Sequence, residues 1–243
     1  MPILRKWEYN GAICGIWKVT ETTDELRSLL TDKSFTPEFF SYKSYSRQLE
    51  FLAVRALIRE LTGAEQRVLH YESGKPYLDG CKSKISISHT KGYVAVALHP
   101  EKETGIDIEY RSDRVKKVVT RFISDKEMSL IDNRLLFITD EDEKDCAMVN
   151  MYLLFWSAKE TMFKMLDSSG VDFLEHLQVR SIIIPELYTK SDGFSFPEAG
   201  VFYGELETVA FKDPGNDVEM NIELYVSQDF VCTYSVSGIN VKT

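Results

Sequence analysis

The sequence has no run of 18 or more apolar residues, which is the length that a membrane-spanning helix needs. The N-terminal residues 1–6 also lack the long apolar stretch of a secretory signal. We therefore expect a cytoplasmic protein that is not inserted in a membrane.

Cysteine is scarce, and positive charge is outnumbered by negative charge. The four cysteines, Cys14, Cys81, Cys146 and Cys232, are far apart and form no CxxC or Cys/His cluster. This pattern predicts reduced thiols, and it argues against zinc ligands or a disulfide framework. The net charge of −9 argues against non-specific nucleic-acid binding, which needs a large positive field.

The length of 243 residues, 44% of them hydrophobic, allows one large domain or two small ones. Apolar spacing predicts a helix over residues 46–61 that ends at Gly63. On its polar side lie Arg47, Arg55 and Arg59, and most arginines in such positions are simply solvated.

A second, longer helix is predicted over residues 148–166, with Phe155, Met162 and Leu166 in its core stripe. The acidic run 140–145 before it is either a solvated loop or the start of that helix. From residue 171 onward the sequence is strand-rich, with separate strands expected at 200–204 and 208–211.

Between the two helices, the stretch Gly105-Ile106-Asp107-Ile108-Glu109 alternates apolar and acidic residues. As a strand it places Asp107 and Glu109 on one face, roughly 6.6 Å apart along the chain. Two carboxylates at that spacing can share one cation. The alternative is a half-buried strand whose polar face meets water.

Further residues could complete a site for phosphates. Ser88 and His89 end an alternating strand, and Lys75 stands in a Gly-Lys-Pro bend. Glu160 and Lys164 lie four residues apart on the long helix, a spacing that is also common in ordinary exposed pairs. If Asp107, Glu109 and Glu160 converge, their oxygens suit Mg²⁺, and the cations could surround a diphosphate.

Four motifs occur in a specific order: Gly74-Lys75-Pro76, Ile87-Ser88-His89, residues 105–109, and Trp156-Ser157-Ala158-Lys159-Glu160 followed by Lys164. In order and spacing they resemble the motifs of the 4′-phosphopantetheinyl transferase superfamily. The similarity is greatest to its monomeric, two-lobed class, which acts on acyl and peptidyl carrier proteins.

This resemblance implies the transfer of the phosphopantetheine arm of coenzyme A to a serine of an apo carrier protein, with release of adenosine 3′,5′-bisphosphate. It implies that Asp107, Glu109 and Glu160 hold Mg²⁺. It also implies that Glu160 accepts the serine proton and that Lys164 stabilises or protonates the leaving phosphate. The coenzyme A phosphates would then be bound by Lys75, Ser88 and His89, with Arg47 and Arg55 as candidates for the 3′-phosphate.

The implied fold is α+β, with two similar lobes, 1–104 and 105–243. Each lobe would pack a helix on a small antiparallel sheet, with the active site in the cleft between them. The expected protein is a monomer. Two other functions remain open: a Mg²⁺-dependent hydrolase that cleaves a pyrophosphate, and a catalytically silent protein that binds coenzyme A or a carrier.

A basic segment follows the acidic strand directly. Residues 111–122 predict an amphipathic helix with Arg111, Arg114, Lys116, Lys117 and Arg121 facing outward. Carrier proteins of the resembled pathways are usually acidic, so this face is a candidate docking surface. An ordinary solvated helix is the alternative.

Overall fold

The computed structural model of the chain describes residues 3–166, 170–183, 189–190, 193–194, 202–211 and 217–237. The chain folds into two compact units, Met1–Ile108 and Glu109–Thr243. The sequence predicts a boundary after residue 104.

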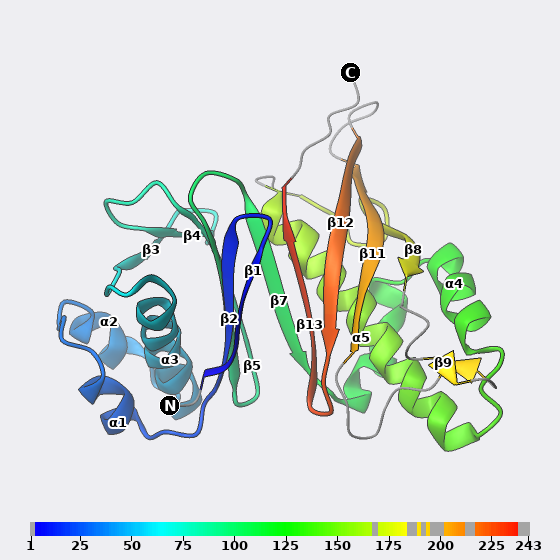
Figure 1. Cartoon of the computed structure of the whole chain (residues 1–243), viewed down its shortest axis with the longest axis horizontal. Coiled ribbons are helices and arrows are strands. Elements are labelled where there is room, and N and C mark those ends of the chain that lie inside the picture. Colours follow the sequence, from blue (N-terminus) through cyan, green and yellow to red (C-terminus); the bar gives the residue numbers. More distant parts are fainter. Residues whose placement is uncertain are drawn as a thin grey trace. The chain divides into compact units, whose positions relative to one another are not determined.

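The first unit pairs four antiparallel strands in the order β1-β2-β6-β5 and adds the hairpin β3-β4. Its strands are β1 (Ile3–Tyr9), β2 (Ala12–Lys18), β3 (Val68–His70), β4 (Pro76–Leu78), β5 (Lys84–Thr90), β6 (Tyr93–His99) and the first five residues of β7 (Thr104–Tyr110). Its helices are α1 (Thr23–Ser28), α2 (Thr36–Ser41) and α3 (Tyr45–Thr62). Helix α3 packs on the face of the sheet formed by β2 and β6 (Figure 1).

Helix α3 confirms the helix predicted over 46–61. Its apolar stripe is fully buried at Leu52 and Leu57. Gly63 ends it in the left-handed conformation, with φ of 76°, which costs a glycine little. Gly15 of β2 allows the close approach of helix and sheet, because a Cβ there would lie 2.9 Å from the side chains of Leu57 and Leu61.

The second unit begins at Glu109, near the end of β7, and its sheet has the order β7-β13-β12-β11-β8. Its strands are β8 (Leu177–Ile183), β11 (Phe202–Phe211), β12 (Asp217–Val226) and β13 (Phe230–Val236), with the short pair β9 (Thr189–Lys190) and β10 (Gly193–Phe194). Its helices are α4 (Asp125–Leu135) and α5 (Glu141–Met165), and two 3₁₀ turns precede them, η1 (Asp113–Lys117) and η2 (Val119–Arg121). Helix α5 packs on β13, β12 and β8 (Figure 1).

The fold is α+β, as predicted, because each unit packs one long helix on an antiparallel sheet. The predicted strand-rich end is also confirmed for the described residues. The described residues of the strands expected at 200–204 and 208–211 form one continuous strand, β11 (Phe202–Phe211), and residues 200–201 lie outside the described part. No helix in the described part of the chain is long and apolar enough to cross a membrane.

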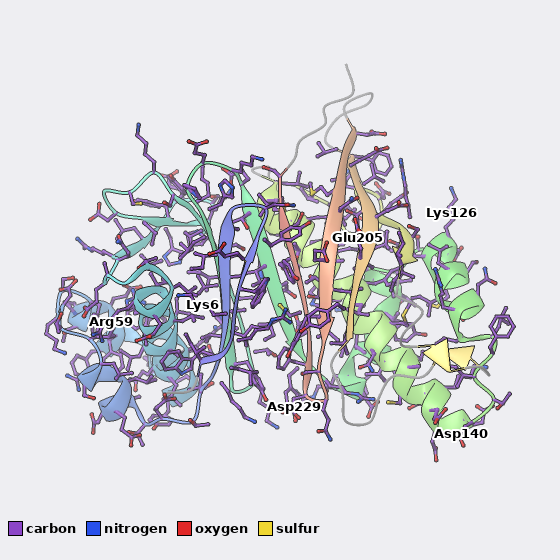
Figure 2. All side chains as sticks on the ribbon, viewed as in Figure 1. Lys6, Arg59, Lys126, Asp140, Glu205 and Asp229 are labelled. Atoms are coloured by element: carbon purple, nitrogen blue, oxygen red, sulfur yellow. The ribbon has the colours of Figure 1, made fainter. Side chains whose placement is uncertain are left out.

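Helix α5 begins earlier than predicted, and the acidic run 140–145 is its start. Asp140 lies at the N-terminal end of α5 (Figure 2). Its side chain accepts a hydrogen bond from the backbone N–H of Glu143 and caps the helix. The acidic residues that follow complement the positive end of the helix dipole. The predicted core stripe is confirmed, since Phe155, Met162 and Leu166 are all buried.

The prediction of an amphipathic helix over residues 111–122 is wrong. The segment folds as η1 and η2, and Val118 between them has φ of −123° and ψ of 0°, which no α-helix contains. Three valines in this short stretch lose side-chain freedom in an α-helix and disfavour it. Val115 and Phe122 are buried as expected, but Val118 is exposed.

The core of the second unit contains a fully buried ion pair between α5 and α4. The amine of Lys159 lies 2.9 Å from a carboxylate oxygen of Glu127, and these residues are 0% and 1% exposed. The same amine donates to the backbone carbonyls of Phe122 and Phe173. Glu127 also accepts the backbone N–H of Val179 in β8, so the pair ties two helices, a strand and two loops together.

Burial lowers the pKa of Lys159, and the attraction of Glu127 partly offsets that shift. Glu127 has a second role as the acidic partner of a capping box with Ser124 at the start of α4. All the hydrogen-bonding capacity of the Lys159 amine is used, which is the condition under which a buried charge is tolerated.

The substitution Lys159→Met tests how far the second unit depends on this pair. We expect it to lower the free energy of unfolding by about 3–5 kcal/mol, because it leaves the Glu127 carboxylate buried without its counter-ion. Urea unfolding measures the loss, and Lys126→Met on the exposed surface of α4 is the matched control (Figure 2). Adding Glu127→Gln to Lys159→Met should recover part of the loss. Equal stability of the Lys159 and Lys126 variants would show that the pair is dispensable.

Candidate active site

Asp107 lies on β7 and is almost completely buried, with 3% of its surface exposed. At Asp107 the polar face of the strand is therefore shielded from water, although Glu109 on the same face is only half-buried. The hydroxyl of Ser88 on β5 donates to the Asp107 carboxylate over 2.8 Å and accepts the backbone N–H of Ile108. Ser86 accepts the backbone N–H of Ile106 in the same way. The two serines share a buried face, as their alternation predicts, and they hold the backbone that carries Asp107.

Glu109 lies two residues further along β7, in the second unit, and is half-buried. The indole N–H of Trp156 donates to one of its carboxylate oxygens over 2.7 Å. Trp156 stands one helical turn before Glu160 on α5, so this hydrogen bond links the acidic strand to the helix that carries the third carboxylate.

Glu160 and Lys164 are half-buried residues of α5, four positions apart. The neighbouring side of the helix is fixed to β13 by hydroxyl contacts. Ser157 and Thr161 lie 2.9 and 2.7 Å from the hydroxyl of Thr233, and all three are fully buried. These contacts set the rotation and height of α5 on its sheet, and so they set where Glu160 and Lys164 project.

The three carboxylates proposed from sequence are divided between the units: Asp107 lies in the first, and Glu109 and Glu160 lie in the second. Over its described residues, neither unit by itself gathers three acidic, histidine or cysteine side chains into a group that could hold a metal ion. The donors still fit Mg²⁺ chemically, because all three are carboxylates and two hold ordered hydrogen bonds that orient them.

Lys75 lies at the bend expected from Gly-Lys-Pro, where Gly74 has φ of 85° and β4 begins at Pro76. Its amine makes an ion pair with Glu103 over 2.9 Å, and Lys84 pairs with the other oxygen over 2.7 Å. Burial alone would raise the pKa of Glu103, but the hydrogen bonds from Lys84 and Lys75 outweigh it and lower that pKa. Any phosphate bound by Lys75 therefore competes with Glu103.

Arg47 and His89 lie together at a pocket of about 410 Å³ in the first unit. The guanidinium of Arg47 is 2.7 Å from Nε2 of His89 and 3.0 Å from the carboxylate of Glu50. The pocket combines these charged groups with apolar walls, which include Val54, Val68 and Ile87. Such a lining suits a ligand that carries both an anionic group and a flat apolar ring.

Arg55 also lines this pocket, but unlike most arginines on the polar side of a helix it is not solvated. Arg55 is only 9% exposed. Its guanidinium lies 3.3 Å from the ring centre of Phe51 and 3.2 Å from a carboxylate oxygen of Glu38. Burial lowers the pKa of Arg55 to about 10. The Arg55 guanidinium therefore already makes a structural ion pair with Glu38 and a cation–π contact with Phe51.

The four cysteines are free thiols, as predicted. Burial raises the pKa of the Cys14 thiol to about 12, so that residue is an inert part of the core.

With this geometry in view, comparison with protein families gives one match. Residues 103–199 match the 4′-phosphopantetheinyl transferase superfamily. This segment of the chain is similar to the domain that defines the superfamily. The resemblance read from the motifs is thereby confirmed at superfamily level. The matched segment contains Asp107, Glu109, Glu160 and Lys164, while Lys75, Ser88 and His89 precede it. No curated protein matches the chain significantly.

The basic residues that follow β7 in the matched segment do not form one uniform face. Lys116 is held by Asp113 and Asp145, and its hydrogen bond to Asp145 raises its pKa. Arg111 contacts the thiol of Cys146. Three exposed cations have no ion pair within the part of the chain that the structure describes: Arg114, Lys117 and Arg121.

Sequence reasoning missed Glu127, Lys159, Glu50 and Glu103. Ser124 and Glu127 carry a local signal, because they match the spacing of a capping box. Lys159 stands inside a recognised motif, yet its burial depends on a partner 32 residues away. Glu103 carries no sequence signal, since it pairs with Lys75 and Lys84, which are distant along the chain. Glu50 lies three residues after Arg47, a spacing common in ordinary helix pairs, and nothing local indicates its contact with His89.

The two serines of β5 provide a test of how Asp107 is held. Ser88→Ala removes both the hydrogen bond to Asp107 and the acceptor for Ile108, whereas Ser86→Ala removes only the acceptor for Ile106. Since losing a partner of a buried polar group costs about 1–3 kcal/mol, we expect Ser88→Ala to be the more destabilising by about 1 kcal/mol or more in urea unfolding. If the two variants lose equal stability, the bond to Asp107 contributes nothing to the fold.

Proposed function

We propose that this protein transfers the 4′-phosphopantetheine arm of coenzyme A to a serine of an apo acyl or peptidyl carrier protein, in a Mg²⁺-dependent reaction. The observation that carries the proposal is the buried carboxylate Asp107, two residues before Glu109 on one strand, inside the segment that matches the superfamily. Glu160 and Lys164 follow in the same segment, on a helix whose rotation is fixed by buried polar contacts.

In the proposed reaction, the carrier serine oxygen attacks the phosphorus that bears the pantetheine arm. The bond from that phosphorus to the bridging oxygen breaks, and adenosine 3′,5′-bisphosphate leaves with the electron pair. Glu160 accepts the proton of the serine hydroxyl. Lys164 stabilises the charge that develops on the leaving phosphate, or protonates it.

Asp107, Glu109 and Glu160 would hold Mg²⁺ together with the diphosphate of coenzyme A. A bound Mg²⁺ supplies positive charge that stabilises the negative charge developing on the diphosphate oxygens. The chain's own part is to orient the carboxylates, which Ser88 does for Asp107 and Trp156 does for Glu109.

Lys75, Ser88 and His89 are the proposed phosphate contacts outside the metal site. For the 3′-phosphate, the geometry favours Arg47 over Arg55. Both arginines line the 410 Å³ pocket, but Arg47 is half exposed and lies against His89, whereas Arg55 is buried and paired with Glu38. The apolar walls of the pocket would then receive the adenine ring.

The proposal takes the working form to be a cytoplasmic monomer, as in the two-lobed class that the motifs resemble. It includes no nucleic acid or membrane partner. The net charge of −9 supports the first exclusion.

The decisive experiment incubates the protein with coenzyme A, Mg²⁺ and a panel of apo carrier proteins, followed by mass analysis of each carrier. We expect one or more carriers to gain a single phosphopantetheine, and a chelator to stop the gain reversibly. Asp107→Asn and Glu160→Gln should each lower the rate at least about 100-fold, because each removes a charge that the transition state requires. Glu141→Gln, in the exposed first turn of α5, is the control and should react normally.

The other outcomes of this experiment contradict the proposal in distinct ways. Cleavage of coenzyme A without a modified carrier would identify a pyrophosphate hydrolase. If coenzyme A stays intact with every carrier, the protein is a catalytically silent binding protein. Full activity of Glu160→Gln would remove both the metal and the base roles of that residue.

Carrier docking gives a second prediction. Arg114, Lys117 and Arg121 present exposed positive charge close in sequence to Glu109, and an acidic carrier would complement it. Each exposed charge pair is worth about 0.2–1 kcal/mol, so Arg114→Glu or Lys117→Glu should raise the carrier KM up to about fivefold at low salt. Coenzyme A binding should not change, and added salt should reduce the difference.

Steady-state kinetics with varied carrier measures this effect, and Lys126→Glu on α4 controls for the change in net charge (Figure 2). If Lys126→Glu raises KM as much as the other reversals, overall charge and not this surface is responsible. An unchanged KM for both Arg114→Glu and Lys117→Glu would identify the segment as an ordinary solvated surface.

A further inference from the structure

Within the second unit, Trp156 donates a short side-chain hydrogen bond to Glu109. The indole nitrogen and a carboxylate oxygen are 2.7 Å apart, at the short end of the range for an N–H donor and a charged acceptor. Indole nitrogen can only donate, and it never competes for a cation. The bond therefore fixes one carboxylate oxygen without opposing the binding of a metal to the carboxylate.

The indole ring is itself held on both sides. Phe122 contacts it edge-on, with ring centres 5.0 Å apart, and Phe173 stacks on it at 5.3 Å and 24°. Both phenylalanines belong to the segments whose carbonyl groups accept hydrogen bonds from Lys159. The position of the indole N–H thus depends on the same buried ion pair that ties α5 to α4.

We infer that Trp156 is a positioning residue for the metal site, acting through Glu109. This inference rests on the proposed function and adds a role for a residue that touches neither substrate nor metal. Groups that hydrogen-bond a metal ligand fix its orientation, and their loss typically costs about 10–100-fold in metal affinity or activity. The alternative is a purely structural tryptophan, whose ring packing alone matters.

Trp156→Phe separates the two roles, since it keeps an aromatic ring between Phe122 and Phe173 and removes only the N–H. We expect the variant to bind Mg²⁺ about 10–100-fold more weakly than the wild type by calorimetry, in the presence of coenzyme A and without a carrier. In the transfer assay, the Mg²⁺ concentration for half-maximal rate should rise by a similar factor, and saturating Mg²⁺ should restore most of the rate.

Trp17→Phe is the matched control. Trp17 also donates its indole N–H to a glutamate, Glu21, over 3.3 Å, and that glutamate has no proposed metal role. Its substitution should leave Mg²⁺ affinity unchanged. Unchanged affinity in Trp156→Phe as well would overturn the inference, while a wild type that binds no Mg²⁺ and modifies no carrier would overturn the proposed function instead.

A second measurement uses the wild-type protein and does not depend on how a variant folds. The chain has three tryptophans, so a ¹⁵N-labelled sample gives three indole N–H resonances in an NMR spectrum. When Mg²⁺ and coenzyme A are added together, the Trp156 resonance should move further than that of Trp17, compared with coenzyme A alone. A Trp156 resonance that does not respond to Mg²⁺ would also overturn the inference.

Discussion

The buried ion pair between Lys159 and Glu127 is the constraint on which the second unit depends. Removing two charges from water is expensive, and the cost is tolerated here because each group has several further partners. Those partners belong to α4, β8 and the segments around Phe122 and Phe173. A single point in the core therefore fixes α5 against most of its neighbours. The residue after Lys159 is Glu160. By fixing the helix, the buried Lys159 side chain also fixes the position of Glu160, which is proposed to act in catalysis.

The other candidate residues are also held in place by buried polar groups that take no part in the proposed chemistry. Each stands on a regular element, and a neighbouring buried polar group holds that element in place. Ser86 and Ser88 hold the strand that carries Asp107, and Thr233 holds the helix that carries Glu160 and Lys164. Sites supported in this way are more rigid than sites built on loops, which suits a reaction that requires carboxylates and phosphates to be aligned.

Much of this could be read from the sequence, because periodicity reports local structure. The helix α3, the core stripe of α5 and the shared face of Ser86 and Ser88 all follow from residue spacing. Contacts that form only in the folded chain could not be predicted from residue spacing. Arg55 has the spacing of a solvated arginine, but Phe51 and Glu38 bury it. The segment 111–122 has helical spacing, but its valines favour two short turns. The convergence of the three carboxylates stays a prediction.

The match to the superfamily covers residues 103–199, and this segment does not coincide with a folding unit. It contains β7 but not the serines of β5 that receive its backbone N–H groups. It contains α5 but stops before β11, β12 and β13, which include the strands that bury one side of this helix. An expression clone cut at the limits of the family match would therefore expose an apolar helix surface and leave a strand without its hydrogen-bond acceptors. Aggregation of such a clone would reflect where it was cut and would say nothing about the activity of the intact chain.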